Sequence, residues 1–354
     1  MRGSMIVYFA MLTFICGLAL WSLFLPKQMQ VVRHGIAFVG YSTMCVFIGL
    51  RDKVGADWDS YKEIFRIINE LPLAKTFIIV EPLYGISNRL VYLAGGDIHI
   101  VNLICATIVL TCLFNFSRLV SIDSNLLLFI ATPYILFVVG MGYTRQSVAV
   151  GLCLNAVGYL RHSKNRRFYL FAGLATLFHY SAIFLILVYW INSVKRTAIV
   201  IAALIAASPV LLLVATSARY VHYTDNSAEM QSHGVWTRIL LILLALTVMF
   251  AQRLKWTNET QLRKVVVRGA VALGFITVLS LFLSTMADRI CLYLFFIYML
   301  GIGSLIRYAR PPSKYLSIYF VVCLTYAIFF AWFGLSAFAA GAWFPYGNAL
   351  YSTT

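Results

Sequence analysis

The sequence predicts an all-α integral membrane protein. Its 354 residues are 62% hydrophobic and 11% charged, and the mean hydropathy is +0.86. Soluble domains are about half apolar and about a quarter charged, so this composition excludes a soluble globular protein. The apolar residues form a series of runs near the roughly 20 residues that a helix needs to cross the hydrocarbon core. We therefore expect a single polytopic membrane domain over residues 5–340.

The apolar runs predict about ten transmembrane helices, which we place at residues 5–26, 34–50, 98–118, 125–141, 146–160, 197–216, 236–252, 265–285, 288–306 and 315–338. The first run is longer than a signal-peptide core and has no small-residue cleavage site before Pro26, so we expect it to remain as a span. Residues 1–4 resemble the remnant of an expression tag. Residues 341–354 are expected to form a short C-terminal tail on the outer face.

Two further apolar segments, 77–94 and 168–192, are predicted to be re-entrant or outer-face helical segments. The most basic loop, 161–167, belongs in the cytoplasm by the positive-inside rule. A single crossing at 168–192 would place the later basic loops outside, whereas an entry and return keeps them inside. Each arm would then have about a dozen residues, too few to span. The same reasoning applies to 77–94, with an ordinary tilted span as the alternative for each segment.

The formal charge of +16 is interpreted through this topology. In a soluble protein such a surplus would indicate nucleic acid. Here nearly all of it falls in predicted cytoplasmic loops, so we expect no nucleic-acid partner. The seven cysteines lie in apolar runs without a CxxC pair, and no metal, phosphate-loop or dinucleotide motif is found. We predict no metal and no cofactor.

The predicted outer side is dense in charge near residues 51–61. In this segment Asp57 and Asp59 flank Trp58, and Tyr61 follows. Carboxylates that accept sugar hydroxyls beside an aromatic ring suit carbohydrate. The alternative is an ordered loop whose acids lie at a helix N-terminus.

Three arginines are predicted near the same level of the membrane. Arg51 follows the second span, and Arg145 and Arg289 lie at the starts of two others. A guanidinium stays charged and matches phosphate oxygens bidentately, so these residues could bind an anion. An ion pair with Asp288, or a side chain extended to the interface, is the alternative for Arg289.

Four other polar residues join this group. Glu81 precedes a proline in an apolar run, Gln146 follows Arg145, and Asp288 precedes Arg289. His179, at the predicted tip of the hairpin, is the histidine placed inside the membrane. Its imidazole could take a proton from a hydroxyl, although a structural histidine is the alternative. Ionisable residues at membrane depth are functional candidates.

Together these motifs resemble a known family. They occur in the order Arg51…Gly55-Ala56-Asp57-Trp58…Tyr61, Glu81-Pro82-Leu83-Tyr84, Arg145-Gln146, Phe178-His179-Tyr180-Ser181, Asp288-Arg289 and Phe344-Pro345-Tyr346. This series resembles the EpsG family of bacterial polysaccharide polymerases, related in role to the Wzy O-antigen polymerases.

The resemblance implies a glycosyltransferase of the integral-membrane C class (GT-C), inverting and independent of nucleotide sugars. It implies an oligosaccharide substrate on undecaprenyl pyrophosphate, at the outer (periplasmic or extracellular) face of the bacterial plasma (inner) membrane. The enzyme would move the growing glycan to the non-reducing end of a fresh lipid-linked repeat unit. Membrane lipid and a chain-length regulator are the other expected partners.

The residues suggest roles in such a reaction. A pyrophosphate leaving group needs fixed cations, for which Arg145 and Arg289 come first and Arg51 third. The acceptor hydroxyl needs a base, either His179 or one of Asp57 and Asp59, and Asp57 is preferred because a carboxylate needs no pKa tuning. Asp288 would orient Arg289.

Two other functions share these features. A transporter or flippase for lipid-linked sugar would also need arginines, and an O-antigen ligase would share the architecture. Transporters often carry an internal repeat with charges at the midplane. In this sequence we find no repeat, and the charges gather near the outer end.

Overall fold

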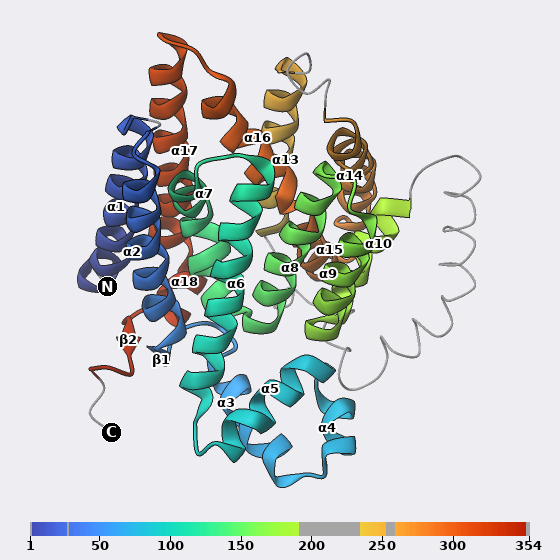
Figure 1. The fold of residues 1–354 in the computed structure, drawn as a ribbon. Coiled ribbons are helices and arrows are strands. Elements are labelled where there is room, and N and C mark those ends of the chain that lie inside the picture. Colours follow the sequence, from blue (N-terminus) through green and yellow to red (C-terminus); the bar gives the residue numbers. More distant parts are fainter. Residues whose placement is uncertain (1, 27, 191–233, 253–258, 352–354) are drawn as a thin grey trace.

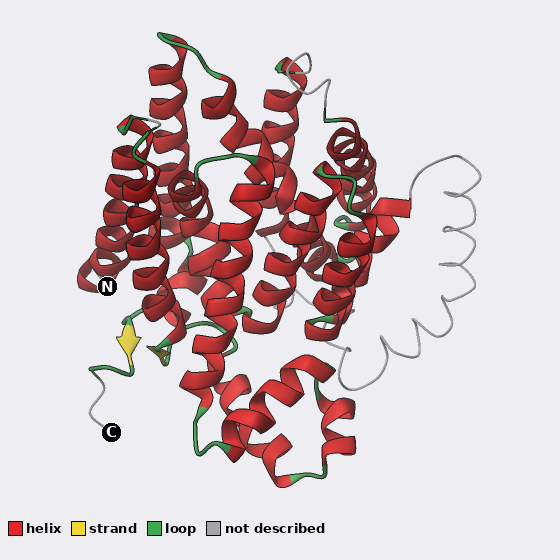
Figure 2. Ribbon diagram, viewed as in Figure 1, coloured by secondary structure: helices red, strands yellow, loops and turns green. Residues whose placement is uncertain are grey.

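The computed structural model describes residues 2–26, 28–190, 234–252 and 259–351. The chain forms a bundle of helices with their axes roughly aligned, and a smaller group of three helices covers one end of the bundle (Figure 1). Nearly all the described residues outside the loops are helical, apart from one pair of short strands (Figure 2).

Most of the described helices form the bundle. They are α1 (Arg2–Phe24), α2 (Gln30–Gly49), α6 (Ile98–Val120), α7 (Ser124–Ala131), η1 (Thr132–Gly140, a π-helix), α8 (Thr144–Arg161), α9 (Asn165–Phe178), α10 (Ile183–Trp190), α13 (Gly234–Ala251), α14 (Thr260–Leu279), α15 (Ser284–Cys291), α16 (Phe295–Tyr308) and α17 (Ser313–Leu335). The remaining elements are α3 (Trp58–Glu70), α4 (Leu73–Ile79), α5 (Pro82–Leu93), α18 (Ala337–Ala342), the 3₁₀ turns η2 (Tyr180–Ala182) and η5 (Leu292–Leu294), and the strands β1 (Arg51–Asp52) and β2 (Gly347–Asn348).

The all-α membrane architecture is confirmed. Within the described residues, six helical segments are long and apolar enough to cross a membrane: Met5–Phe24, Gln30–Gly49, Ile98–Val120, Gly234–Ala251, Ser284–Tyr308 and Ser313–Leu335. Each coincides with one of the ten predicted spans.

Three other predicted spans are helical but are not both long enough and apolar enough to count among these six. The apolar segment Ser124–Gly140, made by α7 and η1, is too short. Helices α8 and α14 are long enough, but they contain too many polar or charged residues to be apolar enough for a span. The tenth predicted span, 197–216, lies outside the described residues.

The segment 168–192 forms a hairpin over its described part. Helix α10 runs back along α9, because the Trp190 indole N–H donates to the Tyr169 hydroxyl at 3.0 Å and the rings of Phe168 and Tyr189 lie 4.4 Å apart. The chain turns at His179, which has extended backbone between α9 and η2. The predicted entry and return is therefore confirmed in its geometry.

The segment 77–94 also does not run the length of the bundle. Its residues end α4 and form α5, and the two helices belong to the group below the bundle, together with α3 (Figure 1). We call α3, α4 and α5 the helical cap.

The described parts of the loops predicted to be cytoplasmic lie at the end of the bundle away from the helical cap (Figure 1). Arg33 lies 3.7 Å from Asp123, and the Glu259 carboxylate forms ion pairs with Arg161 at 2.9 Å and with Arg307 at 3.1 Å. The first pair joins the starts of α2 and α7, and the other two join the ends of α8 and α16 to the start of α14. The common location agrees with the charge-based topology, in which these loops share one side.

The C-terminal segment packs into the end of the bundle near the helical cap. Trp343 is fully buried and its indole N–H donates to the Phe137 carbonyl at 2.9 Å. Strand β2 pairs antiparallel with β1, and Gly55 (φ +104°) donates its N–H to the Ala342 carbonyl at 2.8 Å. The segment from Trp343 to Asn348 thus packs against this end of the bundle, a feature for which the sequence carried no clear signal.

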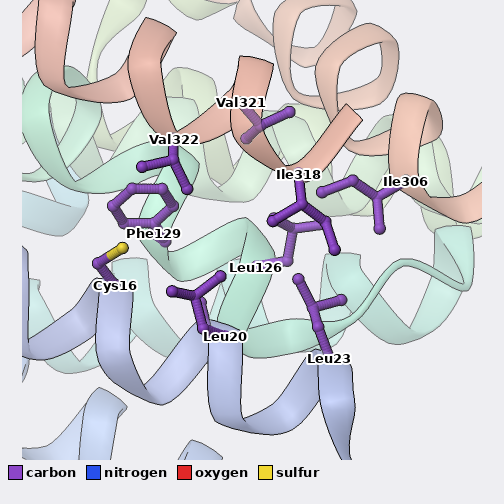
Figure 3. A pocket seen from close by; sticks show the side chains of 10 residues that line it. Cys16, Leu20, Leu23, Leu126, Phe129, Ile306, Ile318, Val321 and Val322 are labelled. Atoms are coloured by element: carbon purple, nitrogen blue, oxygen red, sulfur yellow. The ribbon is translucent and has the colours of Figure 1, made fainter. Parts of the chain in front are cut away.

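The opposite half of the bundle contains one small apolar cavity. It has a volume of about 10 Å³ and lies between α1, α7, α16 and α17, where Cys16, Phe129 and Val321 are among its lining residues (Figure 3). A cavity of this size has room for about one water molecule. This part of the core is therefore closely packed.

Arg51 connects the strand to three helices at the end near the helical cap. It is 1% exposed, and its guanidinium donates to the Ile48 carbonyl at 2.9 Å, the Val54 carbonyl at 3.2 Å and the Thr144 hydroxyl at 2.7 Å. Buried charged donors need such acceptors, since leaving them unpaired is strongly unfavourable. Arg51 therefore holds the start of α8 against the end of α2.

We predict that Arg51→Met lowers the free energy of unfolding by about 2–4 kcal/mol, because it removes charge-assisted hydrogen bonds and leaves buried acceptors unpaired. The measurement is thermal unfolding of the detergent-purified protein. Arg166→Met, at an exposed position in the first turn of α9, is the matched control and should change stability by less than about 0.5 kcal/mol. Equal stability of the two variants would contradict the structural role of Arg51.

Candidate functional site

Glu81 brings together three segments that are far apart in the sequence. It occupies the N-cap position of α5 and its side chain is 2% exposed. Arg145, in the first turn of α8, donates from Nη1 to Glu81 Oε2 at 2.7 Å. His179 Nδ1, at the break of the α9–α10 hairpin, lies 2.9 Å from Glu81 Oε1. Three residues predicted from sequence thus form one connected group.

The charge state of Glu81 determines the tautomer of His179. Burial raises the pKa of Glu81, but the hydrogen bond from His179 and the charge of Arg145 outweigh it and hold the pKa at about 2. An ionised carboxylate only accepts hydrogen bonds, so Nδ1 of His179 carries the proton that it donates. In the neutral imidazole, Nε2 then holds a free lone pair.

His179 lies at the hairpin break, outside the six candidate spans. Burial lowers the pKa of His179 below its ordinary value of 6.5, and the charges of Arg145 and Arg289 act in the same direction. The hydrogen bond to Glu81 opposes this shift without reversing it. The imidazole is therefore neutral at pH 7 and able to accept a proton at Nε2.

Arg145 is held by aromatic rings as well as by Glu81. Its guanidinium carbon lies 5.6 Å from the centroid of Tyr61 and 5.7 Å from that of Tyr84, and its backbone N–H donates to the Tyr61 hydroxyl at 3.4 Å. The side chain remains 22% exposed, and within the described residues its Nε has no hydrogen-bond partner. Arg145 is thus fixed in position with donor capacity left over.

Arg289 is fixed by the residue that follows Arg145. Gln146 Nε2 donates to the Arg289 carbonyl at 2.8 Å, and Arg289 Nη1 donates to Gln146 Oε1 at 3.1 Å. The guanidinium carbon of Arg289 lies 3.9 Å from the centroid of the Tyr143 ring. Two partly exposed arginines therefore lie on either side of the start of α8. Gln146, only 2% exposed, positions Arg289 and has little surface for a substrate.

The role expected for Asp288 needs correction. Its carboxylate is buried and pairs with Arg238 of α13, which also donates from Nη1 to the Asp288 carbonyl at 2.8 Å. The guanidinium of Arg238 lies 5.3 Å from the ring centroid of Tyr134, and Arg238 is only 3% exposed. Asp288 thus anchors α15 to α13 through Arg238 and has little surface for a substrate.

Arg51 and Trp58 also have structural roles. The guanidinium of Arg51 is buried and donates to acceptors within the protein, so it offers no surface to an anion. Trp58 is 6% exposed. The centroid of its ring lies 5.8 Å from the guanidinium carbon of Arg51 and 5.4 Å from the centroid of the His99 ring. These contacts leave the indole face unavailable for a sugar ring.

The two aspartates that flank Trp58 lie on different faces of α3. Asp57 occupies the N-cap position, one helical turn before Tyr61, and its charge acts on the Tyr61 hydroxyl. It is half-buried and lies on the side of α3 that faces Arg145. Asp59 is exposed on the opposite face and is not brought to the group around Glu81.

Sequence reasoning missed several members of this region. Tyr143 stacks on Arg289, Tyr84 packs on Arg145, and the Ser181 and Tyr293 hydroxyls lie 2.9 Å apart between the hairpin and η5. Arg238 could have been found, because it is an arginine inside a predicted span and such residues are rarely without a partner. The tyrosines carried no comparable signal.

Within the described residues, no group of three or more His, Cys, Asp or Glu side chains is arranged to hold a metal ion.

Comparison with known proteins gives one match. The sequence model of the EpsG family matches residues 36–348, a range that includes the hairpin and the residues around Glu81. Neither a curated protein nor a solved structure matches the chain. Because the family match covers most of the sequence, this protein belongs to the EpsG family, which is associated with polysaccharide polymerases.

Proposed function

We propose that this protein is an inverting polysaccharide polymerase with a GT-C-like architecture. It would transfer a growing glycan from undecaprenyl pyrophosphate to the non-reducing end of a lipid-linked repeat unit. The observation that carries the proposal is the ionised Glu81 between Arg145 and His179. It places a neutral base close to fixed cations, which is the combination that glycosyl transfer from a pyrophosphate requires.

The proposed step is a single displacement. The acceptor hydroxyl oxygen attacks the anomeric carbon of the donor, and its proton passes to Nε2 of His179. The bond from that carbon to the pyrophosphate oxygen breaks, and its electron pair stays on the leaving group. Arg145 and Arg289 stabilise the charge that develops there, since guanidinium groups match phosphate oxygens. One displacement inverts the anomeric configuration, and no nucleotide sugar or metal takes part.

The structure favours His179 over Asp57 as the base. Glu81 fixes the ring of His179 and its tautomer, as an orienting carboxylate does for other catalytic histidines. Asp57, near Tyr61, would instead accept a hydrogen bond from a hydroxyl of the acceptor sugar. We do not assign Asp59 or Arg51 a role in the reaction. Gln146 positions Arg289, and Tyr61 positions Arg145.

The proposed location is the outer face of the bacterial plasma membrane. The group around Glu81 lies near the helical cap, at the end opposite the basic loops joined by Glu259. Basic loops are retained in the cytoplasm, so the site would face the periplasm or the extracellular space. The undecaprenyl tail would lie among the membrane helices, and a chain-length regulator would act as an additional partner.

We predict that Arg145→Ala and Arg289→Ala each lower the rate of chain elongation by at least about a hundredfold, because each removes a fixed cation from the leaving group. Elongation is measured with purified protein and lipid-linked repeat units, as a ladder of longer glycans formed without nucleotide sugar. Arg166→Ala, an exposed arginine at the other end, should retain the wild-type rate. Translocation of repeat units by the wild type without elongation would contradict the polymerase.

The Glu81–His179 pair predicts a specific pH dependence. Neutral His179 is the base, and its pKa lies below 6.5. Wild-type activity should therefore decline as the pH falls through the pKa of His179 and stay constant at pH values just above it. The Glu81 carboxylate raises the pKa of His179, so Glu81→Gln should move the acid limb to lower pH and reduce the maximal rate. His179→Gln should abolish elongation at every pH. An acid limb that stays in place in Glu81→Gln, in protein that unfolds at the wild-type temperature, would contradict this role.

The proposed orientation is tested by labelling. Tyr180→Cys, beside the hairpin break, should react with a membrane-impermeant maleimide in intact cells. Ser163→Cys, in the basic loop before α9, should react only after permeabilisation. The unsubstituted chain, with its native cysteines, gives the background. The reverse pattern would place the site on the cytoplasmic side.

A further inference from the structure

A groove with a volume of about 410 Å³ lies along the side of α3 that faces away from Arg145. Asp59, Arg66 and Glu70 recur on one face of this helix, whereas Asp57 and Tyr61 lie on the other. From Asp59 to Glu70 the helix rises by about 16 Å. The helical cap therefore has two distinct faces, one at the group around Glu81 and one along this groove.

The groove contains a buried acceptor without a partner. Asn69 lines it and is 8% exposed, and within the described residues its Oδ1 has no hydrogen-bond partner. The rest of the residue is fixed, since Nδ2 donates to the Phe65 carbonyl at 2.6 Å and the Asn69 carbonyl accepts from Arg89 at 2.6 Å. A rigid, buried acceptor of this kind is unfavourable unless a ligand or water donates to it.

An aromatic side chain forms one wall of the groove. Tyr92, near the end of α5, is 50% exposed, and its ring meets the ring of Phe65 edge to face at 6.3 Å. The contact with Phe65 supports one side of the Tyr92 ring, while the exposed part is available for packing against the apolar face of a sugar.

The polar side chains of the groove are ordered by Arg66. It forms two hydrogen bonds with Glu63, at 2.6 and 3.0 Å, and two with Glu70, at 3.0 and 3.2 Å. Exposed pairs of this kind add little to stability. They do hold a row of carboxylate oxygens in fixed positions, and each oxygen retains lone pairs that can accept from hydroxyl donors.

We propose that this groove binds the oligosaccharide part of the glycan at a subsite separate from the reacting group. The inference rests on the proposed polymerase function. A sugar hydroxyl would donate to Asn69 Oδ1, a ring would pack on Tyr92, and further hydroxyls would donate to Glu63 and Glu70. The groove combines three carboxylates with one lysine and one arginine, a near balance that suits a neutral or weakly charged glycan.

This subsite would hold a glycan segment away from the reacting bond. Because α3 carries the groove on one face and Asp57 and Tyr61 on the other, a chain held here stays next to the group around Glu81. Each additional sugar unit in the groove adds contacts without changing the chemistry. Affinity should therefore rise with oligosaccharide length, and loss of the subsite should shorten the products while leaving the first transfer intact.

Direct binding tests the groove without catalysis. The probes are repeat-unit oligosaccharides released by mild acid from the lipid-linked precursor, one to three units long, added to the purified protein in nanodiscs. Saturation-transfer NMR should show binding that strengthens with length and weakens by about three- to tenfold in Tyr92→Ala and Asn69→Ala. Tyr92→Phe should bind as the wild type does. Tyr351→Ala, an exposed tyrosine near β2 outside the groove, is the matched control.

Product length gives the second readout. In the elongation assay, Tyr92→Ala should join two single repeat units at the wild-type rate but yield chains shorter than those of Tyr351→Ala. Unchanged binding and unchanged chain length would overturn the subsite, as would loss of the first transfer in a Tyr92→Ala protein that unfolds at the wild-type temperature. If the wild type binds the oligosaccharides but never elongates them, the polymerase proposal fails and the groove stands.

Discussion

The hydrogen bonds of one buried carboxylate determine how the end of the bundle near the helical cap is built. Glu81 is 2% exposed, and a carboxylate removed from water is strongly unfavourable unless it is paired. Arg145 and His179 supply the partners, so the start of α5, the start of α8 and the turn of the hairpin must converge on one point. The convergence also explains the aromatic rings around Arg145, because a partly buried guanidinium beside one carboxylate gains further stabilisation from Tyr61 and Tyr84.

The hairpin depends on the same constraint. Within the described residues, α9 has 14 residues and α10 has 8, fewer than the roughly 20 that a span needs. The extended backbone at His179 interrupts the helical hydrogen bonds, which is tolerated at depth only when protein encloses the break. Glu81 accepts from His179 on one side of the break, and the Ser181 hydroxyl pairs with Tyr293 on the other. At the far end, Arg268 of α14 donates to the Tyr189 carbonyl and holds the returning arm. A base on this turn is consequently more rigid than its position in a helix break suggests.

The sequence predicted the all-α membrane class and the turn of the chain at His179, because hydropathy and loop charge are local properties of the chain. The sequence could not show which of Arg51, Arg145 and Arg289 would be buried and which would remain partly exposed. Each follows or opens an apolar run, yet Arg51 is buried among carbonyl and hydroxyl acceptors, while Arg145 and Arg289 remain partly exposed. That difference arises from the partners that tertiary packing provides. Tertiary packing also brings Arg238, from a helix 50 residues earlier, to the Asp288 carboxylate, a partner that the local sequence around Asp288 does not indicate.

Helix α3 presents two chemically different faces. Its buried face places Tyr61 against Arg145, and its exposed face carries the row of acceptors beside Tyr92. A polymerase must bind a donor whose charge lies at the pyrophosphate and also hold sugars that carry only hydroxyls. The first task requires cations fixed in position, as at Arg145 and Arg289, and the second requires acceptors beside an aromatic ring, as at Asn69 and Tyr92. The period of 3.6 residues separates these two chemistries on a single helix, so that the cations do not face the carboxylates that would otherwise neutralise them.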